Sequence, residues 1–191
     1  MVDVKTWKCF PTSIHQIKMN ISNHDQMQMR SYVERGVKDD TLHTISYFKS
    51  LTKIIDEVTK QILEESGYEF DKIEITSMWS NHLKTGQSHP PHTHSNNLLS
   101  GVFYLYSESP ASPIQFFDPR VQSSILSPRN KPNKYNSSMI QFLCLPCTGY
   151  IFPAWLQHWV PPTPVDRISI SWNIIVRGEY GEVVTFQNAN I

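Results

Sequence analysis

Short apolar segments separated by proline, serine, asparagine and glycine fill the chain after residue 67, and this pattern restricts it to a mostly β fold. We expect strands over residues 68–79, 98–106, 114–117, 139–145, 150–152 and 168–176. Thirteen prolines against seven glycines fit loops and turns that join short strands. Strands of this length and spacing form a sandwich or a barrel. The simplest architecture is a mostly antiparallel double sheet of the jelly-roll kind.

One helical pattern precedes these strands. Eight apolar residues recur every three or four positions after residue 41, namely Ile45, Phe48, Leu51, Ile54, Ile55, Val58, Ile62 and Leu63. This spacing predicts an amphipathic helix that ends near Ser66 and Gly67 and packs outside the double sheet. Residues 7–21 favour an edge strand, and residues 22–40 a loop or a short helix. We expect a single domain over residues 1–191, in which residues 1–70 support a jelly-roll core at about 71–178.

Charge and cysteine content exclude several classes of protein. The 191 residues carry 17 Lys+Arg and 17 Asp+Glu, so no net charge attracts nucleic acid or an anionic membrane. No apolar run approaches the roughly 20 residues of a membrane span, and the N-terminal residues lack the shape of a signal peptide. Three cysteines are too few for a disulfide scaffold. We therefore expect a cytoplasmic protein, with a homodimer as one option for its assembly.

Four of the eight histidines lie within thirteen positions, as His82, His89, His92 and His94. Imidazole is a common ligand of iron, zinc, copper and nickel. His92 and His94 are spaced i, i+2 at a strand end, so both side chains point the same way and can reach one ion. His89 precedes the stiff pair Pro90-Pro91, which would carry it roughly 10 Å away at about 3.3 Å per residue. We therefore expect His89 either in a loop or beside the metal ligands, and not as a ligand itself.

A further ligand and an anion site are expected near the C-terminal end. His158 lies in an aromatic segment, GYIFPAWLQHWVPP, and is the candidate third ligand. Nine residues later, Arg167 begins an apolar strand in which period two places Arg167, Ser169 and Ser171 on one face. Arginine offers a two-pronged donor for a carboxylate, and serine adds a hydrogen bond. The sequence thus predicts a metal ion beside a site for an organic acid.

These motifs carry a family resemblance. The segments HTH, SGVFYL, FDPR, GYIFPAWLQHWVPP and DRISISWNI, over about residues 73–178, resemble the iron(II)/2-oxoglutarate-dependent oxygenases related to prolyl and aspartyl/asparaginyl hydroxylases. Such enzymes occur in bacteria and in phages, for which the host cytoplasm would be the compartment. The resemblance implies a double-stranded β-helix, Fe(II), 2-oxoglutarate and O2. It also implies hydroxylation of a protein side chain or a small molecule, with release of succinate and CO2.

The resemblance assigns roles to single residues. His92 resembles the first iron ligand and His158 the distal one. Arg167 and Ser169 resemble the residues that bind the far carboxylate of 2-oxoglutarate, and Tyr104 resembles the tyrosine that helps to hold it. Phe152, Trp155 and Trp159 would exclude water, while residues 84–88 or 121–138 would cover the substrate.

His94 departs from the family pattern, because the family usually has a carboxylate at this place. Either His94 is a true ligand and the iron has three imidazoles, or only His92 and His158 bind and water fills the place. Asp118 is an alternative carboxylate, although it lies about twenty-four residues further on. We favour His94 as a ligand.

Two other functions remain open from the sequence. One is a cupin-like metalloprotein that does not use 2-oxoglutarate, and the other is a non-catalytic jelly-roll module. Arg167 favours the oxygenase, because a generic metal-binding barrel does not need it. Trp79 and Asn81 are candidates for the pocket lining, with core packing an equal alternative for Trp79. We also expect Asn173 to be hydrogen-bonded and the pair Cys144 and Cys147 to be structural.

Overall fold

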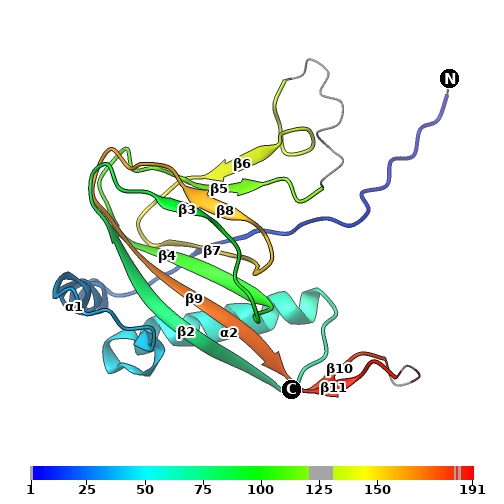
Figure 1. Ribbon diagram of the computed structural model, residues 1–191, viewed down its shortest axis with the longest axis horizontal. Coiled ribbons are helices and arrows are strands. Elements are labelled where there is room, and N and C mark those ends of the chain that lie inside the picture. The colour runs from blue at the N-terminus through cyan, green and yellow to red at the C-terminus, as the bar shows by residue number, and fades with distance from the viewer. Residues whose placement is uncertain (1, 121–130, 183, 185) are drawn as a thin grey trace.

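Two antiparallel sheets face each other, and helices cover the outer side of the larger sheet (Figure 1). The structure is a computed structural model that describes residues 2–120, 131–182, 184 and 186–191. This arrangement confirms the expected mostly β fold with N-terminal helices packed outside. In the described part of the chain, no helix is long and apolar enough to cross a membrane.

The larger sheet has the strand order β1-β7-β4-β9-β2, so β2 forms one of its edges. Its strands are β1 His15–Lys18, β7 Thr148–Pro153, β4 Leu99–Ser107, β9 Arg167–Arg177 and β2 Lys72–Leu83. The smaller sheet has the order β3-β8-β5-β6. Its strands are β3 His89–His92, β8 His158–Val160, β5 Ile114–Phe117 and β6 Met139–Phe142. β10 Glu179–Tyr180 and β11 Ala189–Asn190 form a separate hairpin.

The helical segment begins later than the apolar pattern predicts. Helix α1 spans Asn23–Glu34, and helix α2 spans Lys49–Glu65. Two short 3-10 turns, Leu42–Thr44 and Ser46–Phe48, precede α2. Thr41 is bridged to Met78 on the edge of β2, and Ile45 is extended, so the α-helix cannot start at residue 41. The predicted end is confirmed, because Gly67 has a left-handed φ of +76° just after α2.

Two apolar cores hold these layers together. The outer core joins α1 and α2 to the outward face of β2, β4 and β9, with Met29, Leu51 and Trp172 among its buried residues. The inner core lies between the sheets and includes Tyr104 and Phe152. Neither core fills the inward face of β2 and β9, and the pocket described below lies there.

Several strands depart from the sequence expectation, including β6, which ends at Phe142 rather than residue 145. β2 begins at Lys72 rather than residue 68 and continues to Leu83, beyond the expected end at residue 79. β3 and β8 were not expected as strands, because one contains two prolines and the other has only three residues. Most of the expected substrate cover at 121–138, namely residues 121–130, lies outside the described residues.

A substitution at Gly101 would test the packing of the larger sheet. It lies opposite Trp172 in the β4–β9 ladder, and a Cβ at this position would overlap the fully buried indole ring. We expect Gly101→Ala to lower the free energy of unfolding by about 1–3 kcal/mol, as overpacking does in other cores. Urea denaturation followed by circular dichroism measures this loss. A variant as stable as the parent would show that the indole ring can move aside without cost.

Candidate metal centre and anion site

Three histidines from two distant segments of the chain meet at one point. His92 ends β3, His158 begins β8, and the two are paired in register. His94 lies just past β3, where its backbone N–H donates to the Ala154 carbonyl at 2.9 Å. One ligand atom from each of the three imidazoles lies within 4.8 Å of the others, which could hold a metal ion. The structure therefore brings together the three histidines that the spacing singled out.

Backbone carbonyls orient two of these rings. His92 Nδ1 lies 2.8 Å from the Pro90 carbonyl, and His158 Nδ1 lies 2.9 Å from the Leu156 carbonyl. A carbonyl oxygen only accepts, so each neutral ring carries its proton on Nδ1 and leaves the Nε2 lone pair unprotonated. Histidines that bind metals are fixed in this way. The donor set thus fits a divalent metal.

Burial keeps two of the imidazoles neutral. Desolvation lowers the pKa of His94 to about 4 and that of His158 to about 3. Neighbouring histidines contribute in the same direction at both sites. A metal ligand must be deprotonated, and these two side chains meet that condition throughout the physiological pH range.

The lowered pKa values make stability depend on pH. Below pH 6.5, His158 takes up a proton in the unfolded chain but not in the folded one, so stability is lost as the pH falls from 6.5 toward 3. Between pH 7.5 and 5.5 we expect the metal-free protein to lose about 1.4 kcal/mol from His158 alone, with His94 adding to the loss. Urea midpoints at the two pH values measure it. In His158→Asn the difference should shrink, and an unchanged difference would contradict this explanation.

Arg167 is a buried cation without an acidic partner among the described residues. Its residue surface is only 2% exposed, and its Nη1 donates to the Ser112 carbonyl at 2.8 Å. Its Nε is buried and has no hydrogen-bond partner. The neighbouring Tyr104, whose ring centroid is 4.8 Å from the guanidinium carbon, also has a buried hydroxyl without a partner. A buried donor without an acceptor lowers the stability of the folded protein. An organic acid whose oxygen atoms accept hydrogen bonds from Arg167 Nε and from the Tyr104 hydroxyl would remove this cost.

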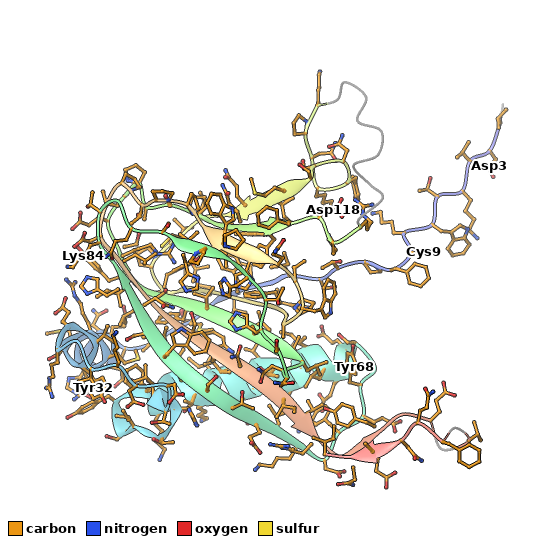
Figure 2. The ribbon with its side chains drawn as sticks, in the orientation of Figure 1. Asp3, Cys9, Tyr32, Tyr68, Lys84 and Asp118 are labelled. Atoms are coloured by element: carbon orange, nitrogen blue, oxygen red, sulfur yellow. The ribbon has the colours of Figure 1, made fainter. Side chains whose placement is uncertain are left out.

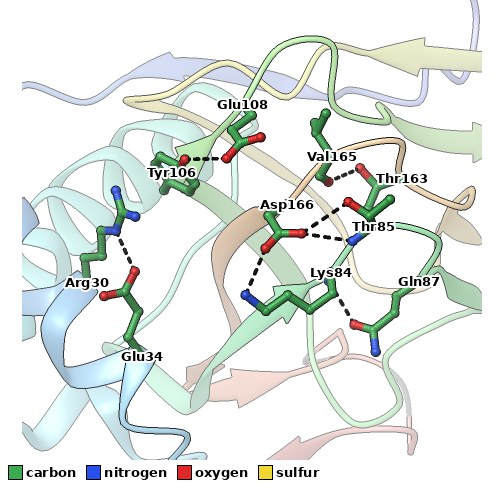
Figure 3. A network of polar contacts seen from close by, with 10 residues as sticks. All are labelled: Arg30, Glu34, Lys84, Thr85, Gln87, Tyr106, Glu108, Thr163, Val165 and Asp166. Carbon is green, nitrogen blue, oxygen red and sulfur yellow. Dashed lines mark hydrogen bonds and ion pairs between the residues drawn. The ribbon is translucent and has the colours of Figure 1, made fainter.

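The nearest carboxylate in the sequence is held away from Arg167. Asp166 accepts from Lys84 Nζ at 2.8 Å and from the Thr85 backbone N–H at 3.0 Å, as Figure 3 shows. These contacts hold the pKa of Asp166 below its usual range and tie the turn after β2 to the start of β9. Residues 84–88, expected as a substrate cover, are therefore anchored at Lys84 and Thr85.

A single pocket joins the histidines to the anion site. It is lined by the three histidines and by inward residues of β2 and β9, namely Trp79, Asn81, Arg167, Ser169 and Ser171. The predicted shared face of Arg167, Ser169 and Ser171 is confirmed, as are Trp79 and Asn81 in the lining. Asn173 is hydrogen-bonded to Ser77 and Ser100, as expected for a buried amide.

His89 lies in β3 beside the candidate ligands, which agrees with one of its two expected places and corrects both the loop and the distance of roughly 10 Å. Its ring centroid lies 4.4 Å from that of His92, and it lines the same pocket. The pairing of β3 with β8 is irregular between His89 and His92, and Pro90 and Pro91 are both exposed. This bulge turns the two prolines outward and returns both histidines to one side. A fully extended chain, which the 10 Å estimate assumed, does not occur here.

The aromatic wall also differs from the expectation. Trp155 is 56% exposed and cannot exclude water, and Trp159 does not line the pocket. Strand alternation places His158 and Val160 inward, which turns Trp159 outward. Phe152 does line the pocket, as expected, and its ring centroid lies 4.7 Å from that of His158. The ring centroid of Phe116 lies 5.6 Å from the same imidazole.

Asp118 lies outside the metal centre. It pairs with Arg120 at 2.7 Å, and it is absent from the group of described residues that could hold a metal. Figure 2 shows it past the end of β5, at the opposite end of the sheets from Lys84.

Comparison with protein families decides the class of this centre. A family model described as "Putative 2OG-Fe(II) oxygenase" matches residues 77–173, just over half of the chain. The chain belongs to this family. It is an iron(II)- and 2-oxoglutarate-dependent oxygenase, which resolves the open choice against the cupin-like and non-catalytic alternatives. The match covers β2 to β9 and so includes the three histidines, Arg167 and Ser169.

Solved structures share the fold of this oxygenase. A prolyl-4-hydroxylase from Pseudomonas putida superposes with a TM-score of 0.62 at 11% identity, covering 86% of each chain. A viral collagen prolyl hydroxylase from Paramecium Bursaria Chlorella virus-1, in complex with 2-oxoglutarate, gives a TM-score of 0.56 at 14% identity, covering 84% of this chain and 94% of the other. The epimerase SnoN from nogalamycin biosynthesis gives 0.63 at 9% identity, covering 92% and 83%. A search of curated proteins found no match.

Proposed function

We propose that this oxygenase binds iron(II) through His92, His94 and His158 and hydroxylates a protein side chain or a small molecule. One observation carries the proposal. The buried guanidinium of Arg167, without an acidic partner among the described residues, opens into the same pocket as the imidazoles of His92, His94 and His158. A metal centre beside an unmatched buried cation suits an organic acid that binds both.

The residues around Arg167 have roles in this proposal. Arg167 donates its remaining N–H groups to the far carboxylate of 2-oxoglutarate, and Ser169 in the lining adds a hydrogen bond, as does Tyr104, which is buried beside Arg167 outside the lining. Three protein ligands leave coordination positions for the 2-oxo acid and for O2. When bound, iron supplies the activation of O2 that couples decarboxylation of 2-oxoglutarate, to succinate and CO2, to insertion of one oxygen atom into a substrate C–H bond. Phe152 and Phe116 keep water from the triad.

An anaerobic titration tests this function. Fe(II) is added to the metal-free protein, and 2-oxoglutarate follows while the visible spectrum is recorded. We expect the charge-transfer band of a chelated 2-oxo acid, and pyruvate, which lacks the second carboxylate, should need a much higher concentration to produce it. Iron binding without the band would contradict the use of 2-oxoglutarate. Absence of iron binding would contradict the metal centre itself.

A reducing cytoplasmic compartment is part of the proposal. All three cysteines, Cys9, Cys144 and Cys147, are free thiols, which supports a compartment where disulfides do not persist.

The structural role expected for Cys144 agrees with its place in the inner core.

A further inference from the structure

The charges that line the pocket do not balance. Four imidazoles and one guanidinium face it, and none of the described residues that line it is a carboxylate or a lysine. This inference rests on the proposed function, in which neutral imidazoles hold iron(II). Iron then brings two positive charges and Arg167 a third, while 2-oxoglutarate supplies only two negative charges. One positive charge is left over in a partly buried site.

Neighbouring acids do not cancel this charge. Asp166 is paired with Lys84 and Asp118 with Arg120, so both carboxylates lie in ion pairs outside the lining. An ion that is partly removed from water is costly unless an opposite charge compensates it. A group of negative charge must therefore come from outside the chain.

One wall of the pocket lies away from the backbone of Arg167. The Cα atoms of Ser171 and Arg167 are four residues apart along β9, or about 13 Å at about 3.3 Å per residue. The five-carbon chain of 2-oxoglutarate has four bonds of about 1.5 Å, so it spans about 5 Å. Ser171 and Trp79, its partner across the β2–β9 ladder, therefore form a part of the lining distinct from the Arg167 end.

Two hydrogen-bond donors on this wall have no acceptor among the described residues. Asn81 Nδ2 donates to Ser171 Oγ at 3.2 Å. Because Ser171 Oγ accepts this bond, its own hydrogen is available, and Asn81 Nδ2 keeps a second hydrogen. Trp79 lies beside them, with its ring centroid 5.8 Å from that of His94, so the wall adjoins the metal centre.

We infer that the substrate carries a carboxylate that binds to Asn81 and Ser171 and neutralises the remaining positive charge of the loaded pocket. The two donors fix its orientation, and Trp79 packs against the carbon atoms next to it. A neutral substrate would leave the charge uncompensated, and a cationic one would increase it. The substrate class is thus a monoanion at this wall, either a small acid or an acidic side chain of a peptide.

A pair of probes that differ in charge alone tests the inference. N-acetyl-glutamate amide and N-acetyl-glutamine amide are titrated anaerobically into the protein with Fe(II) and saturating 2-oxoglutarate, and calorimetry gives their dissociation constants. We expect the acidic probe to bind roughly ten- to fifty-fold more tightly, as one unit charge at about 7 Å allows. Equal affinities, tighter binding of the amide, or no binding of either probe would overturn the inference.

Variants of the wall locate the effect. Asn81→Asp adds a negative charge and should remove the preference for the acidic probe, whereas Asn188→Asp, the same change on the exposed β10–β11 hairpin, should leave it intact. Ser171→Ala removes one donor and should weaken the acidic probe more than the amide. If both pocket variants kept the original preference, the anion would bind elsewhere and the inference would fail.

Two further measurements separate the alternatives. In the first, potassium chloride is titrated into the loaded protein, and the acidic probe is added afterwards. If chloride saturates the site and the acidic probe then no longer binds, the site belongs to an inorganic anion and not to the substrate. The iron and 2-oxoglutarate band is recorded before any probe is added. Its absence would reject the proposed function, whereas a normal band with no preference for the acidic probe would reject this inference alone.

Discussion

Arg167→Ala is expected to weaken 2-oxoglutarate binding by about 100-fold or more, because truncating one partner of a buried charge pair costs at least about 2–5 kcal/mol. The residue contributes no metal ligand, so the affinity for Fe(II) should stay within a few-fold of the parent. The anaerobic charge-transfer titration reports both values in one experiment.

A conservative variant sharpens this prediction. Arg167→Lys keeps the positive charge but loses the two-pronged geometry, so its 2-oxoglutarate affinity should fall between those of the parent and Arg167→Ala. Equal loss of iron and 2-oxoglutarate affinity in Arg167→Ala would show that the arginine supports the fold of the centre, and the assignment would then be wrong.

His158→Ala is expected to reduce iron binding by more than about 100-fold. Removing only the outer partner of a metal ligand costs about 10–100-fold, and this change removes a ligand itself. His158 is also the most deeply buried of the three histidines. Equilibrium dialysis of the variant against Fe(II) under anaerobic conditions measures the loss.

Two other histidines provide the comparison. His94→Asp restores the carboxylate that related enzymes use and should still bind iron. His82→Ala changes a histidine on β2 that does not line the pocket, and it should leave iron affinity unchanged. Normal iron binding by His158→Ala, or loss of binding in His82→Ala, would contradict the proposed ligand set.

Regular segments made part of this site predictable from the sequence. β9 is an uninterrupted strand over Arg167–Arg177, so alternation correctly placed Arg167, Ser169 and Ser171 on one face. The same reasoning correctly paired His92 with His94, whose ring centroids lie 5.0 Å apart. Where a local period persists without interruption, side-chain direction follows from residue spacing alone.

Irregular and long-range features could not be predicted in this way. The bulge that brings His89 into the pocket interrupts the period at two prolines, and residue spacing does not report such an insertion. The start of α2 depends on the bridge from Thr41 to β2, which forms only in the folded protein. Asn81 and Ser171 are ninety positions apart, and their contact depends on the β2–β9 register, which no local pattern encodes.

The buried guanidinium of Arg167 also constrains how this fold can evolve. In the proposed function, a cation that is 2% exposed and donates to one carbonyl destabilises the folded chain until the 2-oxoglutarate dianion binds to it. Selection for a stable empty protein and selection for co-substrate binding therefore oppose each other at this position. Because a ligand that binds only the folded state raises its population, the cellular supply of 2-oxoglutarate would govern how much of the protein escapes degradation as well as how fast it turns over.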